Sequence, residues 1–366
     1  MDYGAITLDT SIFVQKGLSL ESGLLKTLEQ FRDKPYPFIL SEIVIREVQD
    51  RLIKKTSEVR SQVSKAIQAS RAHLSIDEIL IHEAEKLLIP SDGDNSVVEQ
   101  RIKLYKENTG LQIVPVNGYV DLDLIVEKYF GSFPPFSELR NKKNEFPDAL
   151  ALISIEAWAQ EKGIKVLAVS IDRDWEEFAR ESGCIDVFDD LAEAIAVFQP
   201  HNAAIEYYGR LSKEFSKRQS DIISEIERYL MLQVPELEIY PVATSPYFLA
   251  PDKIDIIYSS FEFLLDENNL ALVQPVEAQE NYIVVEVKIA INATATCSFS
   301  LMAYDSISIG ETTAFERIEF DTAILISIEG DFLNEPEHAR VDSIELLSYP
   351  KQIDFGEIEP DWWHEN

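Results

Sequence analysis

The stretch Val166-Leu167-Ala168-Val169-Ser170-Ile171-Asp172 is an apolar run that ends in a serine and an aspartate. Its apolar residues do not alternate with polar ones, which is typical of a strand buried on both faces of a parallel sheet. Similar runs occur at 6–8, 38–40 and 113–116, and a less apolar one, which includes Asp186, at 186–188. Helical patterns fill the gaps, at about 18–31, 41–72, 76–88, 95–108, 119–130, 147–162, 174–181 and 190–198. The alternation predicts an α/β fold with a parallel sheet flanked by helices.

The pattern of the sequence changes after residue 200. Residues 201–235 space their apolar side chains as one helical stripe, which predicts a helical connector. Beyond Pro235, β-branched and aromatic runs predict antiparallel strands, arranged as a small sandwich or as a sheet packed on the connector. These runs lie at 254–258, 282–292, 294–301, 317–320 and 323–328. We therefore expect domains at 1–200 and 236–366, with the connector at 201–235 between them.

The composition excludes several classes of protein. The 366 residues are 46% hydrophobic, enough for two packed cores, and no apolar run approaches the roughly 18 residues of a membrane span. The two cysteines lie far apart and the five histidines form no closely spaced pair, which argues against a disulfide framework and a Cys- or His-ligated zinc. Without a signal-like N-terminus, we expect a cytoplasmic protein.

The net charge of −32 is unevenly distributed. Residues 236–366 contain 5 Lys and Arg against 26 Asp and Glu, which accounts for −21 of the total. A field this negative repels phosphate backbones, so broad nonspecific nucleic-acid binding is disfavoured. Binding to a nucleic acid would need a local basic patch or a metal ion.

Several acidic residues stand where strands or helices are expected to begin or end, and each also has a structural explanation. Asp9 and Asp172 directly follow predicted strands and could cap the next helix. Asp174 lies two residues after Asp172, and one cap does not easily explain both. Asp148 could complement the dipole of its helix, and Glu47 could pair with a basic residue four positions on.

Taken together, the acidic residues predict a cation site. The carboxyl ends of parallel strands lie along one edge of a sheet, so Asp9, Glu47, Asp148 and Asp172 could converge there. Four carboxylates within a few ångströms would repel one another strongly unless cations neutralise them. One or two Mg²⁺ or Mn²⁺ ions suit such oxygen ligands.

The order of four short motifs resembles the PIN-domain ribonucleases over about residues 1–198. The motifs are Asp9-Thr10-Ser11, Ile43-Val44-Ile45-Arg46-Glu47-Val48, Pro147-Asp148-Ala149-Leu150-Ala151 and Ser170-Ile171-Asp172-Arg173-Asp174-Trp175. The resemblance implies a Rossmann-like sheet and Mg²⁺- or Mn²⁺-dependent cleavage of RNA, in which a metal-activated water attacks the phosphorus. It also implies the toxin-like or defence-associated setting common in that family.

The same resemblance assigns roles to individual residues. It makes Asp9, Glu47, Asp148 and Asp172 the acidic quartet, with Asp174 as an additional or alternate metal ligand. Ser11 and Ser170 match the family's small hydroxyl residues beside the first and last of these acids.

The chain departs from the compact family members between the second and third acids. About 100 residues separate Glu47 from Asp148, which resembles a larger subgroup with a Lys-rich segment before the third Asp. Lys142 and Lys143 fit that description. The long insertion leaves open whether Glu42 or Glu47 is the second acid.

Basic residues near these acids could bind phosphates. Arg51, Lys54 and Lys55 share a helical face with Glu47. A nucleic-acid backbone that runs past Glu47 could contact such a basic strip. The alternative is ordinary ion pairing on a solvated helix. Lys142 and Lys143 form a second patch, whose alternative is a polar loop.

The acidic residues 236–366 are better suited to binding a protein partner, oligomerisation or regulation than to holding RNA. Two other functions remain open from the sequence. The first is a nuclease acting on structured DNA, and the second is a catalytically silent PIN scaffold that binds proteins through the β-rich region.

Overall fold

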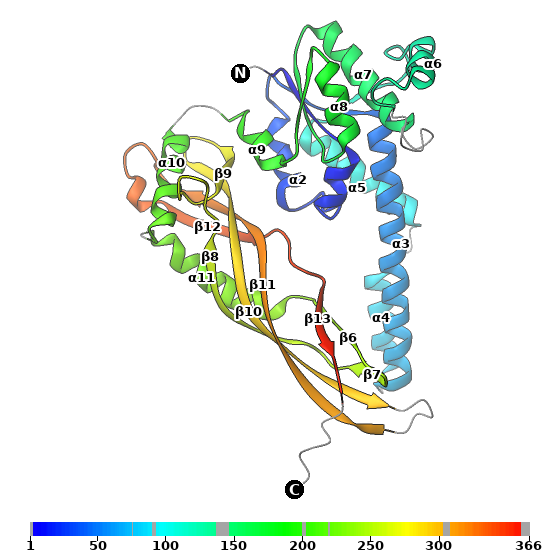
Figure 1. Ribbon diagram of the computed structural model, residues 1–366, viewed down its shortest axis with the longest axis vertical. Coiled ribbons are helices and arrows are strands. Elements are labelled where there is room, and N and C mark those ends of the chain that lie inside the picture. Colours follow the sequence, from blue (N-terminus) through cyan, green and yellow to red (C-terminus); the bar gives the residue numbers. More distant parts are fainter. Residues whose placement is uncertain are drawn as a thin grey trace. The chain divides into compact units, whose positions relative to one another are not determined.

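The structure is a computed structural model that describes residues 3–74, 76–89, 93–136, 146–199, 203–218, 220–302 and 308–359 (Figure 1). The chain divides into two compact units, Met1–Phe198 and Gln199–Asn366. No helix in the described ranges combines the length and the apolar character needed to cross a bilayer.

The first unit is built on a parallel sheet with the strand order β3-β2-β1-β4-β5. The strands are β1 (Ala5–Leu8), β2 (Phe38–Ser41), β3 (Gln112–Val114), β4 (Val166–Val169) and β5 (Ile185–Phe188). Every residue of β1, β2 and β4 is buried, as their uninterrupted apolar character predicts. All five predicted strands are confirmed, although β3 ends before Pro115, which has no N–H to donate to a ladder.

Helices connect the strands. They are α1 (Thr10–Gln15), α2 (Gly23–Thr27), the 3₁₀ turn η1 (Leu28–Phe31), α3 (Glu42–His73), α4 (Glu78–Leu88), α5 (Asp94–Thr109), α6 (Leu122–Gly131), α7 (Phe146–Lys162), α8 (Arg173–Glu181) and α9 (Leu191–Ala196). The single helix predicted at 18–31 is wrong. Gly17, Leu18 and Gly23 all have positive φ, which interrupts a right-handed helix and divides this stretch into short pieces.

The strand order creates a switch point at the centre of the sheet. The chain moves outward from β1 to β2 and β3, then returns to place β4 on the other side of β1. In open parallel sheets, the connections on either side of such a point diverge and leave a crevice at the carboxyl ends of the two strands. Here those strands are β1 and β4, which lead directly into Asp9 and Ser170.

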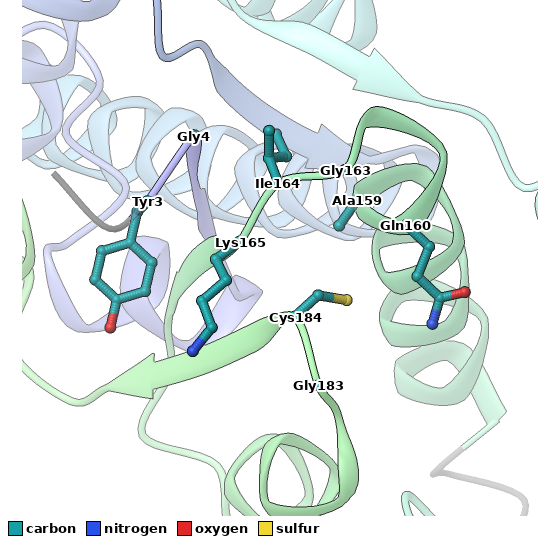
Figure 2. Close-up of a pocket in the computed structure, with 9 residues that line it drawn as sticks. All are labelled: Tyr3, Gly4, Ala159, Gln160, Gly163, Ile164, Lys165, Gly183 and Cys184. Carbon is teal, nitrogen blue, oxygen red and sulfur yellow. The ribbon is translucent and has the colours of Figure 1, made fainter.

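The opposite, amino-terminal edge of the same sheet carries an open pocket (Figure 2). Tyr3 and Gly4 precede β1, Lys165 precedes β4 and Cys184 precedes β5. The two strand entries are packed closely, because a Cβ on Gly4 would come within 2.7 Å of the Ile164 side chain. No residue that lines this pocket is acidic, so it differs chemically from the carboxyl edge.

The second unit begins with two helices, α10 (Ala203–Ser216) and α11 (Ile222–Gln233), and the 3₁₀ turn η2 (Val234–Glu236). The residues expected to form a helical connector between two domains form this pair within the second unit, and Arg218 between the helices has φ 51°. Their apolar side chains lie in the core of the second unit, where Phe215 stacks on Phe263 with ring centroids 4.9 Å apart. They therefore form one layer of this unit.

The other layer is an antiparallel sheet. Its strands are β7 (Phe248–Pro251), β8 (Asp255–Phe263), β9 (Val273–Ala278), β10 (Tyr282–Met302), β11 (Ser308–Glu329) and β12 (Arg340–Leu346). A separate parallel pair joins β6 (Tyr240–Thr244) to β13 (Gln352–Glu357). The predicted runs at 282–292 and 294–301 merge into β10, and those at 317–320 and 323–328 merge into β11. Polar positions such as Asn292 and Asp321 stay in their strands because both are paired across the β10–β11 ladder.

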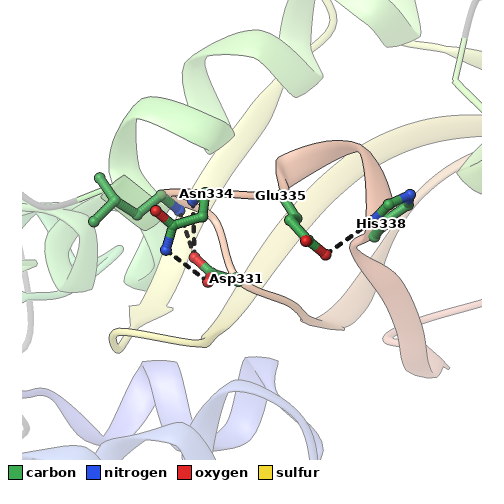
Figure 3. A network of polar contacts seen from close by, with 5 residues as sticks. Asp331, Asn334, Glu335 and His338 are labelled. Carbon is green, nitrogen blue, oxygen red and sulfur yellow. Dashed lines mark hydrogen bonds and ion pairs between the residues drawn. The ribbon is translucent and has the colours of Figure 1, made fainter.

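A polar network closes the connection between β11 and β12 (Figure 3). Asp331 accepts hydrogen bonds from the side-chain amide of Asn334 at 2.8 Å and from the backbone N–H groups of Asn334 and Leu333 at 2.9 and 3.1 Å. These contacts lower the pKa of its carboxyl group. Gly330 is needed for a close approach, because a Cβ there would lie 2.8 Å from the Cα of Ala339. The turn η3 (Pro336–His338) then leads into β12.

Candidate active site

Asp9 lies at the carboxyl end of β1, with only 5% of its surface exposed. It occupies the N-cap position of α1, yet its side chain makes no capping hydrogen bond. Its carboxylate instead accepts hydrogen bonds from the Ser11 hydroxyl and, at 2.9 Å, from the Ser170 hydroxyl. Burial raises the pKa of Asp9, and the two hydroxyl groups oppose that rise. The backbone N–H groups of Ser11 and Thr10 also lower that pKa, so the start of α1 accounts for only part of the surroundings of Asp9.

Ser170 links the end of β4 to the end of β1. While its hydroxyl donates to Asp9, the same oxygen accepts a hydrogen bond from the Asp172 N–H at 3.0 Å. Asp172 in turn caps α8, since its Oδ1 accepts the Asp174 N–H at 3.0 Å. The capping explanation thus holds for Asp172. It does not explain Asp174, which is 5% exposed in the first turn of α8.

Glu47 and Glu42, the two alternatives for the second acid, have different surroundings. Glu47 accepts a hydrogen bond from the Thr10 hydroxyl at 2.7 Å, which ties it to the residue next to Asp9. Glu42 accepts the Val116 N–H at 3.1 Å and pairs with Arg46, so it holds the chain beyond β3. The geometry favours Glu47.

Asp148 lies within electrostatic range of three other acids of the candidate site. It lies in the first turn of α7, and its Oδ1 accepts a hydrogen bond from the indole N–H of Trp175 at 3.4 Å. Burial, followed by the negative charges of Asp9, Glu47 and Asp172, raises the pKa of Asp148 to about 7. The charges of Asp9 and Glu47, each more than 100 positions away in the sequence, therefore act on this carboxyl group.

Two residues of this cluster were not among the sequence-based candidates. Thr10 is part of the quoted Asp9-Thr10-Ser11 motif, and its hydroxyl beside Asp9 was an available signal. Trp175 follows Asp174, but nothing in the sequence distinguishes a core tryptophan from one that donates to a carboxylate. Both residues are buried.

The donor set suits a hard divalent cation in charge and in chemistry. Asp9, Glu47 and Asp148 form no ion pair with any described residue, so within that part of the chain no side-chain cation balances their charge. Carboxylate oxygens are the ligands that Mg²⁺ and Mn²⁺ prefer. Within the described ranges, however, no three His, Cys, Asp or Glu side chains are grouped closely enough to hold an ion. The residues fit a metal ion, but their present positions do not form a finished coordination shell.

The basic residues of α3 fall into two groups. Arg60 pairs with Asp94 at 2.6 Å, and Arg71 pairs with Glu78 and Glu85, as the ion-pairing alternative predicts. Arg51, Lys54 and Lys55 are exposed and have no ion-pair partner in the described part of the chain. These three, which we name the α3 basic strip, follow Glu47 along the helix. Lys142 and Lys143 lie outside the described residues.

Comparisons with known proteins agree with this geometry. No curated protein and no solved structure matches the chain. Residues 6–175 match a family model described as PIN domain, a span that begins in β1, ends at Trp175 and contains all the acidic residues of the cluster. A PIN domain suggests a nuclease, so the match supports nuclease activity on a nucleic acid in general terms. The first unit of this chain is therefore a PIN domain.

Proposed function

We propose that this PIN domain is a Mg²⁺- or Mn²⁺-dependent endoribonuclease. The observation that supports the proposal most directly is the effect of Asp9, Glu47 and Asp172 on the pKa of Asp148. Four carboxylates within electrostatic range of one another do not favour folding, because their repulsion opposes it unless a cation or a proton neutralises part of the charge. Such clusters are typical of functional sites.

Each group of side chains in the site has its own proposed role. Asp9, Asp148 and Asp172 would hold the ion, with Asp174 as a further ligand, and Glu47 completes the acidic quartet. A bound divalent ion supplies water activation and charge compensation on the phosphate. Ser11 and Ser170 orient Asp9 by donating to its carboxylate. The α3 basic strip would hold the phosphate backbone beside the cluster.

The proposal predicts metal-dependent cleavage of single-stranded RNA by the full-length chain. Labelled RNA and DNA of the same sequence are incubated in parallel with Mn²⁺, with Mg²⁺ and with excess EDTA. We expect internal cuts in the RNA with either ion and none in EDTA, because the carboxylates cannot act on a phosphate without a cation. Cleavage of a structured DNA with intact RNA would favour the DNA-nuclease alternative. No cleavage, together with no Mn²⁺ binding in calorimetry, would favour the silent scaffold.

The α3 basic strip predicts a change in the salt dependence of RNA binding. Replacing Arg51, Lys54 and Lys55 together by Gln should lower the slope of log K against log salt by about 2, because each single-strand phosphate contact contributes about 0.7. Filter binding in EDTA at several salt concentrations measures the slope. Arg60→Gln with Arg71→Gln is the matched control, since both side chains are already paired on the same helix. An unchanged slope in the triple variant would show that the strip is only a solvated helix face.

For residues 236–366 we propose a role apart from RNA binding. Their net charge of −21 opposes contact with a phosphate backbone, so a protein partner or a second copy of the chain suits this region better. We also propose that the chain acts in the cytoplasm.

A further inference from the structure

Two uncharged side chains hold two of the acidic residues. The Trp175 indole N–H donates to Asp148 Oδ1 at 3.4 Å, and the Thr10 hydroxyl donates to Glu47 Oε2 at 2.7 Å. Trp175 is fully buried and Thr10 is 8% exposed. Neither has a part in the proposed chemistry, so their contacts with the acids need a separate explanation.

Trp175 ties together the starts of two helices. An indole N–H can only donate, and when buried it needs an acceptor, which here is a carboxylate oxygen. Trp175 lies in the first turn of α8 beside Asp174, and Asp148 lies in the first turn of α7. The ring therefore couples the orientation of Asp148 to α8, the helix that Asp172 caps. A phenylalanine at 175 would fill most of the same space but offer no donor.

Thr10 couples the orientation of Glu47 to the end of β1. Glu47 sits on the 32-residue helix α3, whereas Thr10 follows Asp9 at the end of β1. A glutamate has three side-chain torsions, so its carboxylate is poorly ordered unless something holds it. The Thr10 hydroxyl provides that contact next to Asp9.

Both donors are uncharged, so they can orient the carboxylates without competing with a metal ion. A lysine or arginine in either place would orient the carboxylate but also neutralise it, in competition with a metal ion. A neutral N–H or O–H binds one oxygen lone pair and leaves the negative charge available. Metal ligands are commonly held in this way by partners outside the coordination shell, and loss of such a partner typically weakens metal binding about 10- to 100-fold.

We infer that Trp175 and Thr10 are positioning residues, which hold Asp148 and Glu47 in the orientations from which the cluster binds a divalent cation. The inference rests on the proposed metal-dependent function. It assigns no contact with substrate to either residue.

Isothermal titration calorimetry of Mn²⁺ binding to the metal-free full-length chain tests the inference without any nuclease assay. Trp175→Phe and Thr10→Val should each weaken Mn²⁺ binding about tenfold or more. Thr10→Ser keeps the hydroxyl and should restore affinity. Trp158→Phe is the control for a buried tryptophan, on the same helix as Asp148. Thr27→Val is the control for a hydroxyl, since Thr27 donates to a backbone carbonyl of its own helix.

A double-mutant cycle separates positioning from packing. If Trp175 acts through Asp148, then Trp175→Phe should have almost no further effect on Mn²⁺ affinity in an Asp148→Ala background. The same holds for Thr10→Val in a Glu47→Ala background. A role in general packing would instead give additive losses and the same fall in melting temperature with or without Mn²⁺.

The outcomes are distinguishable. A wild-type chain that binds no Mn²⁺ overturns the proposed function, and this inference falls with it. If the wild type binds Mn²⁺ and both single variants bind it equally tightly, the inference alone is overturned. Additive losses of Mn²⁺ affinity in the two double-mutant cycles overturn it as well.

Discussion

Replacing Asp9 and Asp172 together by Asn should reduce RNA cleavage by about a thousandfold or more. The two residues follow β1 and β4, the strands that meet at the switch point of the sheet. Their carboxylates would supply two of the proposed ligands, and the stabilisation provided by a bound metal is worth several kcal/mol in a transition state. Initial rates on labelled RNA at saturating Mn²⁺ measure the loss.

The substitutions are chosen so that the fold is retained. After Asp9→Asn, the new amide oxygen can still accept the hydroxyls of Ser11 and Ser170, and Asn is as good an N-cap as Asp for α8. Asp77→Asn is the matched control, because Asp77 caps α4 through the same contact, at 2.8 Å to the Ile79 N–H, away from the cluster. Cleavage that survives in the double variant, with an unchanged circular dichroism spectrum, would exclude the cluster as the site.

The sequence is sufficient to place these residues because the information is local at each one. Val166–Val169 is apolar without alternation, so it must be buried on both faces, and strands of that kind occur in parallel sheets. Once the sheet is parallel, acids that follow its strands must lie at one edge. The positions of Asp9 and Asp172 therefore follow from two short stretches, without knowledge of the intervening chain.

The contacts of the side chains could not be predicted in the same way. Trp175 and Thr10 donate hydrogen bonds to partners 27 and 37 positions away, and such pairings depend on how helices pack. The choice between Glu42 and Glu47 was open for the same reason, since both lie at the start of α3. The periodicity of apolar residues also gave a wrong helix prediction where the backbone conformation of single residues determines the local structure. The positive φ angles of Leu18 and Gly23 break the helix that the apolar pattern alone predicts at 18–31.

The stability of the metal-free protein should fall as the pH rises from about 4 to about 7, because of Asp148. The folded chain keeps this proton up to a pKa of about 7, while the unfolded chain releases it near the ordinary value of 3.8. Between these values the folded state binds more protons, so the free energy of unfolding decreases with increasing pH. The largest loss that this difference allows is about 4 kcal/mol.

Asp148→Asn should remove that loss, because the amide is uncharged at every pH. Without divalent ions, we expect the variant to exceed the wild type by about 2 to 4 kcal/mol in the free energy of unfolding at pH 8, and to equal it near pH 4. Hydrogen exchange of the β1 and β4 amides reports the first unit separately from the second. Asp50→Asn, at an exposed position of α3, is the control and should show no pH-dependent gain.

Mn²⁺ should reverse the order of the two proteins. An ion that binds only the folded state raises the free energy of unfolding, by an amount that grows with the logarithm of the ratio of ion concentration to Kd. The wild type has the carboxylate ligand at position 148, and the variant lacks it. The same substitution should also abolish RNA cleavage. A variant that is more stable without metal, less stable with it and inactive would show that Asp148 is kept for cation binding at the expense of the fold. Equal stability of both proteins at pH 8 would mean that burial and the neighbouring carboxylates do not raise the pKa of Asp148 as the structure indicates.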